Sequence, residues 1–271
     1  MKHFPSIFLS LLLPLAVAAQ SVQIQDGAIR AEFSVSDSTK VYFSQGNLQY
    51  KASTNTWRFA EHQWDYVGYD NENISEKYVG WIDLFGWGTS GYNGKNPYMT
   101  SKKDTDYGDG ENDIAGTNYD WGVYNKISNG GNQTGLWRTL TYDEWRYLRY
   151  DRKNADALYG TAMVNREEGY VFLPDNWTTP TGITFECGAN FYQNIYSASD
   201  WSKMETNGAV FLPAADLRGG TYVTSDDGYY WSSSASGGHF AYCLYFDGYG
   251  LETGCSDRSN GESVRLVQDV K

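Results

Sequence analysis

Two cysteines near the C-terminal end of the chain have a spacing that could support redox chemistry through a disulfide. Cys243 and Cys255 lie 12 positions apart in a region expected to form a hairpin, so they can form a disulfide that leaves Cys187 unpaired. Alternatively, all three cysteines are free and fill small, half-buried sites. A zinc site is not expected, because the chain has only three histidines and no Cys-x-x-Cys or His-x-x-x-His spacing.

An acidic loop offers a second set of candidate ligands. Residues 103–116 (KDTDYGDGENDIAG) supply the carboxylates of Asp104, Asp106, Asp109, Glu111 and Asp113, and oxygen-rich loops of this kind can hold calcium. The spacing does not match an EF-hand, and the Glu-Pro-Asn and Gln-Pro-Asp motifs of calcium-dependent sugar-binding lectins are absent. A calcium loop and a solvated acidic loop both remain open. No metal ligands and no cofactor are assigned.

The strongest functional signal is a C-terminal segment that combines an apolar frame with small polar and aromatic residues. In FAYCLYFDGYG (240–250), period-2 alternation places Tyr242, Leu244 and Phe246 on one face and Cys243, Tyr245 and Asp247 on the other. If the first set packs inward, the second belongs to an exposed patch that reaches loop 253–257. The predicted ligand-binding residues of this patch are His239, Cys243, Tyr245, Asp247, Tyr249, Thr253, Ser256 and Asp257.

The elements that must position this patch follow from hydrophobic periodicity. Strands are expected at 28–35, 56–68, 162–174, 208–219, 229–235, 240–246 and 262–268, and 40–51 is expected to form a hairpin around Gln45-Gly46-Asn47. Residues 69–118 lack helical periodicity and are expected to be loops packed by their own aromatic side chains. The pattern predicts an α+β domain.

Two short helices are expected within this domain. Residues 140–152 contain Thr141 and Glu144, which fit a capping box. Residues 197–208 begin with a serine cap and end at Asn207-Gly208. Five side chains are expected to be structural rather than functional, namely Trp145, Trp201, Arg218, Trp231 and Arg265.

Composition limits the classes of partner. Residues 1–19 contain one lysine, an apolar run and a small-residue end, which predicts a secretory signal peptide and a secreted or cell-surface protein. Residues 20–39 are expected to be a leading strand and linker, and 40–271 one folded domain. A net charge of −12 opposes nucleic acid and anionic lipid. No membrane span is expected after the signal segment.

Five motifs together resemble a known family: DWGVYN (120–125), LWRTLTYDEWRYL (136–148), GAVFLPAADLRG (208–219), GYYWSSS (228–234) and GESVRLV (261–267). The chain resembles the secreted paralogous domains of Bacteroidetes and Fibrobacter, which are related to the formylglycine-generating-enzyme branch of the C-type lectin fold. That branch includes variable proteins of diversity-generating retroelements. The resemblance implies a C-type-lectin-like domain with two short helices, several short antiparallel strands and long loops.

The resemblance also bears on chemistry. Segment ADLRGGTY (215–222) resembles the Arg-Gly-Gly segment of formylglycine-generating enzymes, which bind copper through two nearby cysteines, whereas Cys243 and Cys255 are 12 positions apart. We therefore expect no enzymatic activity. Diversity-generating retroelements replace adenines in selected codons. Several residue types of the C-terminal patch, Gly254 and Cys255 included, are ones that an asparagine codon can encode after its adenines are replaced.

Three functions follow. The leading one is an exported, non-catalytic protein that binds a protein or glycan on a cell, host or phage surface. The alternatives are a structural or adhesin-like envelope component and a divergent formylglycine-type oxidase.

Overall fold

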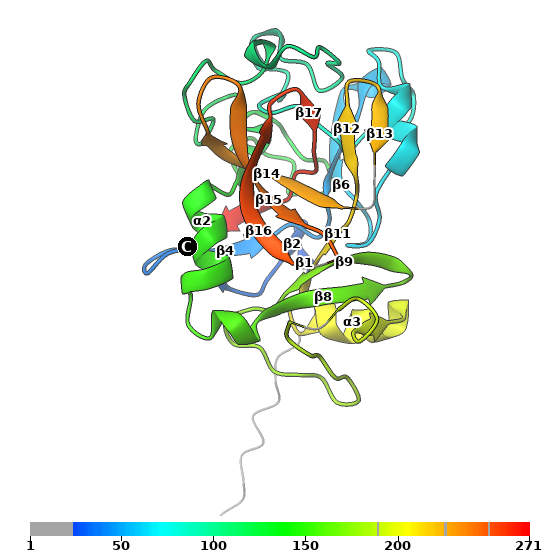
Figure 1. Cartoon of the computed structure of the whole chain (residues 1–271), viewed down its shortest axis with the longest axis vertical. Helices are drawn as coiled ribbons and strands as arrows, with labels where there is room; N and C mark the ends of the chain where they lie inside the picture. The colour runs from blue at the N-terminus through cyan, green and yellow to red at the C-terminus, as the bar shows by residue number, and fades with distance from the viewer. Residues whose placement is uncertain (1–23, 189, 225–226, 249) are drawn as a thin grey trace, which may run out of the picture.

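A computed structural model describes residues 24–188, 190–224, 227–248 and 250–271 (Figure 1). The protein is a mixed α+β structure in which short strands predominate and the helices are few and short. The expected signal peptide, at residues 1–19, lies outside the described residues. Within the described ranges, no helix combines the length and the apolar character needed to cross a bilayer.

One four-stranded sheet joins the two ends of the described chain. Its order is β3-β4-β18-β7, and its strands are Phe33–Ser34, Lys40–Phe43, Leu266–Asp269 and Arg138–Thr139. The C-terminal strand β18 occupies an inner position and pairs antiparallel with both β4 and β7. The buried side chains of Ile29, Ala31, Phe33 and Val35 join the same core as β4 and β18, so segment 28–35 packs as part of this body.

A three-stranded sheet, β14-β15-β16, lies at the centre of the molecule in Figure 1. Its strands are Gly228–Ala235, Phe240–Phe246 and Leu251–Asp257. Its residues divide between two hydrophobic clusters: Trp231 and Ala241 belong to one, and Tyr230, Leu244 and Phe246 belong to the other. The buried positions predicted for Trp231, Leu244 and Phe246 are confirmed, and Val264 and Leu266 are buried as well.

A separate layer forms the lower part of the molecule in Figure 1. It is the sheet β10-β8-β9-β11, with strands Ile195–Tyr196, Tyr159–Val164, Glu167–Phe172 and Val210–Pro213. Strands β8 and β9 form a hairpin whose turn residues, Asn165 and Arg166, both have positive φ, as a two-residue turn of type I′ requires. The single strand predicted at 162–174 is therefore wrong. A third hydrophobic cluster joins this sheet to helix α3 through Trp201, Met204 and Phe211.

The remaining strands form smaller sheets. They are β13-β12-β17 (Tyr222–Thr224, Leu217–Gly219, Asn260–Gly261), β5-β6 (Leu48–Lys51, Thr56–Phe59) and β1-β2 (Ile24–Gln25, Ala28–Ile29). Short 3₁₀ turns are η1 Ala52–Thr54, η2 Gly68–Asn73, η3 Tyr92–Gly94, η4 Asp104–Asp106 and η6 Ala155–Ala157.

Both predicted helices are confirmed. Helix α2 (Tyr142–Arg146) begins at a complete Thr141–Glu144 capping box and continues as a π-turn, η5, over Tyr147–Asp151. Helix α3 (Ala198–Thr206) is capped by Ser197 and ends at Asn207. A third helix, α1 (Trp121–Tyr124), is a single turn capped by Asp120, which is too short to produce a periodic signal in the sequence.

The predicted hairpin at 40–51 is wrong. Strand β4 pairs with β3 and β18, whereas β5 pairs with β6. The amides of Ser44 and Leu48 both donate to the C-terminal segment, to the carbonyls of Leu266 and Val264, each at 2.9 Å. Between β4 and β5 the chain therefore passes from one sheet to another and runs beside the C-terminal segment. The two strands do not pair with each other, because each has a partner elsewhere in the chain.

The long stretch 69–118 contains no named strand among its residues and is packed by aromatic side chains, as expected. Phe85 and Trp87 are fully buried. The Trp87 indole donates to the Ser232 carbonyl at 2.8 Å, and the Trp231 indole donates to the Phe85 carbonyl at 2.7 Å. These bonds fix the loops to the central sheet.

The predicted structural roles of two arginines are confirmed. Arg218 is fully buried and donates to the carbonyls of Leu84 and Gly220. Arg265 is also buried and donates to the side-chain oxygens of Gln63 at 2.7 Å and Asn47 at 3.2 Å. Trp145, Trp201 and Trp231 lie in the core, as expected. These side chains hold loops and strands together from inside.

Candidate functional site

The predicted C-terminal patch lies on a sheet that is covered on both sides for much of its length. Cys243 is only 3% exposed and packs in the core with Trp231, contrary to its expected place on an exposed face. The opposite face carries Leu244 and Phe246 into the other core cluster. Alternate side chains of β15 therefore point to two different faces of the sheet, but both faces are buried around Cys243 and Leu244.

The register divides the remaining predicted residues between the two faces. Residues directly opposite each other in an antiparallel pair share a face. Tyr245 pairs with Glu252 and Ala241 with Ser256, so Tyr245 and Ser256 share one face of the sheet. Thr253 pairs with Leu244, and Asp257 with Phe240, which places them on the other. The predicted residues thus do not form one continuous patch.

Tyr245 and Asp247 are brought together, and both are partly exposed. The Tyr245 hydroxyl donates to Asp247 Oδ2 at 2.8 Å, and Asp247 Oδ1 accepts from the Gly250 amide at 3.1 Å. The Tyr229 ring lies 4.9 Å from that of Tyr245. Burial and the bond to Asp247 raise the pKa of Tyr245. Tyr249, also predicted for this patch, lies outside the described residues.

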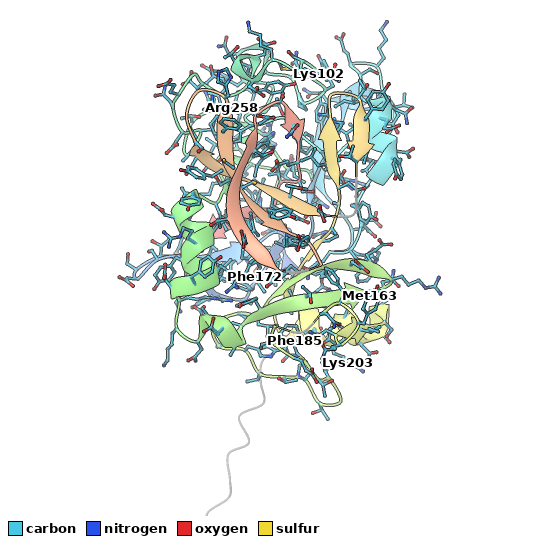
Figure 2. All side chains as sticks on the ribbon, in the orientation of Figure 1. Lys102, Met163, Phe172, Phe185, Lys203 and Arg258 are labelled. Atoms are coloured by element: carbon cyan, nitrogen blue, oxygen red, sulfur yellow. The ribbon has the colours of Figure 1, made fainter. Side chains whose placement is uncertain are left out.

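His239 is exposed and lies at the opposite end of β15. Its Nδ1 is 3.9 Å from Asp104 Oδ2, so the acidic loop reaches the C-terminal strands. Asp104 Oδ1 also accepts from the Ser259 amide at 3.0 Å. Arg258, labelled in the upper part of Figure 2, donates to the Gly110 carbonyl. Half-buried Asp104 thus fixes the acidic loop to the C-terminal strands, so this carboxylate is not simply solvated.

The three cysteines are free. Cys243 pairs with Gly254, and Cys255 pairs with Tyr242, so the two cysteine side chains leave opposite faces of the sheet. A disulfide between them is excluded in this arrangement, since bridged Cβ atoms must approach within about 4.5 Å. In the part of the chain that the structure describes, no three His, Cys, Asp or Glu side chains are grouped closely enough to hold a metal ion.

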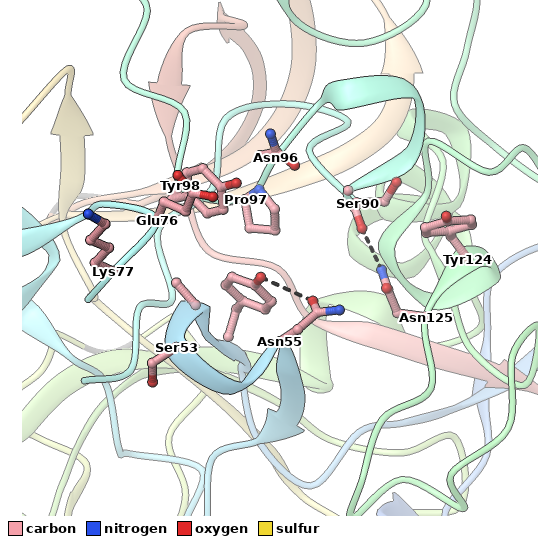
Figure 3. Close-up of a pocket in the computed structure, with 13 residues that line it drawn as sticks. Ser53, Asn55, Glu76, Lys77, Ser90, Asn96, Pro97, Tyr98, Tyr124 and Asn125 are labelled. Carbon is pink, nitrogen blue, oxygen red and sulfur yellow. Dashed lines mark hydrogen bonds between the residues drawn. The ribbon is translucent and has the colours of Figure 1, made fainter. Parts of the chain in front are cut away.

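Another candidate site is a recess of about 700 Å³ (Figure 3). We call it the tyrosine-amide recess. It is formed by the turn after β5, by two parts of the 69–118 stretch and by the end of α1. Its lining residues are Tyr50, Ala52, Ser53, Asn55, Glu76, Lys77, Ser90, Gly91, Asn96, Pro97, Tyr98, Tyr124 and Asn125.

The first wall of the recess is built by the end of β5 and the turn η1. Tyr50 is 4% exposed and pairs through its backbone with Ile82, at 2.8 Å from the Tyr50 amide to the Ile82 carbonyl. Asn55 closes the turn in the left-handed conformation, which asparagine tolerates better than most residues. The side chain of Asn55 is held by a 3.1 Å hydrogen bond, which the Tyr50 hydroxyl donates to Asn55 Oδ1. The amide of Asn55 is thereby oriented at the edge of the recess (Figure 3).

The second wall is built where α1 meets residues 90–92. Asn125 Nδ2 donates to the Ser90 carbonyl at 2.9 Å and to the Trp121 carbonyl at 3.1 Å. The Tyr124 ring, 40% exposed, lies 5.4 Å from that of Tyr92 in a T-shaped arrangement. The wall is therefore fixed by packing and hydrogen bonds before any ligand arrives.

Tyr98 lies across the recess from Tyr124, beside Glu76 and Lys77 (Figure 3). It is partly exposed and packs against the same core cluster as Tyr50. Burial and the nearby charge of Glu76 raise the pKa of Tyr98. Its hydroxyl therefore stays protonated, and it can act as a hydrogen-bond donor at neutral pH.

No family model, curated protein or solved structure matches this chain. The geometry of the sites must therefore carry the functional argument.

The tyrosine-amide recess could not be found from the sequence, because its walls come from segments up to 75 positions apart, Tyr50 to Asn125. Each segment is ordinary loop sequence by itself. The one available signal is the repeated proximity of tyrosine and asparagine, in YNGKNPY (92–98) and YN (124–125). That composition is typical of recognition surfaces, but it also resembles ordinary turn sequence.

Proposed function

We propose that this protein is an exported, non-catalytic ligand-binding protein with a C-type-lectin-like fold, and that the ligand occupies the tyrosine-amide recess. The observation that carries the proposal is the fixed arrangement of three tyrosine rings and two oriented amides around a recess of about 700 Å³. Concave sites of this size with a few fixed polar groups are the usual form of ligand pockets in proteins.

The fold part of the proposal is supported by two features. Strand β18 pairs with β4, so the ends of the domain meet in one sheet. The stretch 69–118 extends as packed loops from this body and supplies two parts of the recess. Long loops on a rigid sheet scaffold are common carriers of recognition residues.

A non-catalytic role is supported by the cysteine geometry. A copper site of the formylglycine-generating type needs two thiolates in one tight arrangement, whereas Cys243 and Cys255 leave opposite faces of their sheet. Burial, and to a smaller extent the charge of Glu262, also raise the pKa of Cys243 well above that of a free thiol. A buried, protonated thiol is a poor nucleophile and a poor metal ligand.

The binding function is tested with cells and polysaccharides as targets. The labelled protein is incubated with intact bacterial and epithelial cells and with immobilised polysaccharides, and bound protein is measured by fluorescence. We expect binding to at least one target, and loss of that binding in the Tyr98→Ala/Tyr124→Ala double variant. Equal signals for wild type and double variant on every target would overturn the proposed recess.

A separate assay tests the absence of catalysis. The protein is incubated with copper, oxygen and a cysteine-containing sulfatase peptide, and aldehyde formation is measured by mass spectrometry. We expect none. Aldehyde formation that is lost on substitution of Cys243 or Cys255 would replace the binding function with an oxidase.

The C-terminal recognition face remains a second candidate surface, and only its described part can be argued. The hydrogen bond between Tyr245 and Asp247 and the packing of Tyr229 give it a fixed aromatic-carboxylate pair. A Tyr245→Ala/Asp247→Ala variant in the same cell assay separates this face from the recess. Diversification by a retroelement is part of this second proposal, and a reverse-transcriptase gene with a near-copy of codons 229–267 beside the gene would support it.

A further inference from the structure

We infer that the tyrosine-amide recess binds a neutral saccharide, an inference that rests on the proposed binding function and names the chemical class of its ligand. The first observation is the charge of the lining. Among the described residues that line it, Glu76 and Lys77 are the only charged ones, so their charges cancel, although the chain as a whole has a net charge of −12. A recess without net charge inside an acidic protein is poorly suited to an anionic ligand and provides no excess charge for a cation.

The second observation is the placement of aromatic rings. Tyr124 presents an exposed ring, and Tyr98 lies across the recess from it (Figure 3). The electron-rich face of an aromatic ring attracts the weakly positive C–H groups that line one side of a pyranose. Tyr92, whose ring lies against both Tyr124 and Tyr119, at 5.4 and 5.1 Å, restricts the motion of this platform. A fixed ring stacks on a ligand with little loss of side-chain entropy.

The third observation is the pairing of donors and acceptors at the rim. Asn55 Oδ1 is occupied by the Tyr50 hydroxyl, so its NH₂ group is the part of the amide that remains to donate to a ligand. Asn125 has the opposite arrangement, because its NH₂ group is occupied and its oxygen remains as an acceptor. Glu76 adds an acidic acceptor. A hydroxyl group both donates and accepts, so a polyhydroxyl ligand satisfies both kinds of group at once.

The aromatic platform and the rim together disfavour other ligands. A purely apolar ligand would leave the Asn55 and Asn125 groups desolvated and unpaired, which costs free energy. A flat protein surface would not fill a recess of about 700 Å³. The volume is in the range of pockets for drug-sized molecules, so it accommodates a short oligosaccharide as well as a single ring.

The direct test is titration calorimetry with neutral oligosaccharides (cello-, malto-, manno- and galacto-series) and with an anionic series derived from heparin. We expect binding of at least one neutral series and none of the heparin fragments. Tyr124→Ala should weaken binding about tenfold or more, since central aromatic contacts commonly contribute over 1 kcal/mol. Tyr124→Phe should retain most of the affinity, because it keeps the ring.

A second variant separates recognition from folding. Asn55→Gly keeps the left-handed backbone, which glycine adopts freely, and removes the oriented amide together with the acceptor of the Tyr50 hydroxyl. We expect a melting temperature only slightly lower than that of the wild type, since one such hydrogen bond contributes about 1 kcal/mol, and about tenfold weaker binding. Tyr192→Ala is the matched control, because Tyr192 is an exposed tyrosine outside the recess, and it should bind as the wild type does. Neutral-sugar binding that is unaffected by both Tyr124→Ala and Asn55→Gly would place the site elsewhere and overturn the inference.

Treating the target cells distinguishes this inference from the proposed function. Periodate cleaves vicinal diols of surface glycans, and protease removes surface proteins. Loss of recess-dependent binding after periodate but not after protease supports the saccharide ligand. Loss after protease alone overturns the saccharide inference and leaves the binding function intact. Binding that never depends on Tyr98 and Tyr124 overturns both.

Discussion

The Asp120 carboxylate accepts two hydrogen bonds from Thr139. Its Oδ2 accepts from the Thr139 amide at 2.9 Å, and its Oδ1 accepts from the Thr139 hydroxyl at 3.0 Å. Oδ1 also caps α1 by accepting from the Gly122 amide at 3.1 Å. This fully buried side chain therefore connects helix α1, which carries Tyr124, to strand β7, which pairs with β18. One wall of the tyrosine-amide recess is thus fixed to the sheet that joins the chain ends.

Asp120→Ala should destabilise the protein strongly. The substitution leaves two buried amides and a buried hydroxyl without this acceptor, and each such group costs about 1–3 kcal/mol, so a total of about 3 kcal/mol or more is expected. Chemical denaturation with urea measures the change. Asp70→Ala, at an exposed position, is the control and should have little effect. If the two variants were equally stable, the connection between α1 and β7 would be unimportant.

Leu244 and Tyr245 are neighbours on β15 and should respond differently to truncation. Leu244 is fully buried, so Leu244→Ala should cost about 2–5 kcal/mol. Tyr245 is partly exposed, but its ring pairs with Tyr229, so Tyr245→Ala should cost about 1 kcal/mol. Thermal unfolding of both variants checks the order. A Tyr245→Ala variant less stable than Leu244→Ala would contradict the assignment of Leu244 to the core.

Glu262 should make the protein less stable as the pH rises. Burial raises its pKa to about 8, and side-chain hydrogen bonds with Ser256 and Cys243 offset this effect only in part. Because the folded-state pKa is above the unfolded value of 4.5, this group's favourable contribution is complete below about pH 4.5. It is lost as the pH rises through about 8.

Glu262→Gln removes this titration. At about 1.4 kcal/mol per pKa unit, the variant should gain on the order of a few kcal/mol over the wild type between about pH 5 and pH 9. Urea unfolding at a series of pH values measures the difference. Glu252→Gln, on the exposed edge of β16, is the control. A pH profile of Glu262→Gln parallel to that of the wild type would show that Glu262 does not titrate in this range.

The three cysteines should differ in reactivity toward a maleimide. Cys255 is exposed and should react in the native protein. Cys187 should react more slowly, because burial raises its pKa and its thiol donates to the Ala157 carbonyl at 3.1 Å. Cys243 should react only after denaturation. Intact mass spectrometry with and without denaturant counts the adducts. A peptide linking Cys243 to Cys255 under non-reducing conditions would contradict the strand register.

Local signals in the sequence were sufficient for α2 and α3. The Thr141–Glu144 box and the Ser197 cap lie within one turn of the helices they begin, so a short window contains the whole determinant. The partners of these helices need not be known, because capping acts on neighbouring residues. The turn at Asn165 and Arg166, by contrast, falls inside the single strand predicted at 162–174, because Asn-Arg is not one of the usual hairpin-turn pairs.

Non-local competition explains the errors. The pattern at 40–51 fits a hairpin, but β4 and β5 find better partners in β18 and β6. Alternation in β15 correctly separates Leu244 from Cys243, yet it cannot show that both faces are covered. The recess depends on four segments whose proximity is set by the whole fold. Periodicity describes one element at a time, so it does not report which elements meet.

The inner position of β18 has a consequence for biosynthesis. Strands β4 and β7 both need residues 266–269 as their pairing partner, so their sheet cannot be complete before the ribosome has added these residues. Contacts between such distant segments form slowly. The nascent chain should therefore remain unfolded in this region until residues 266–269 have been synthesised.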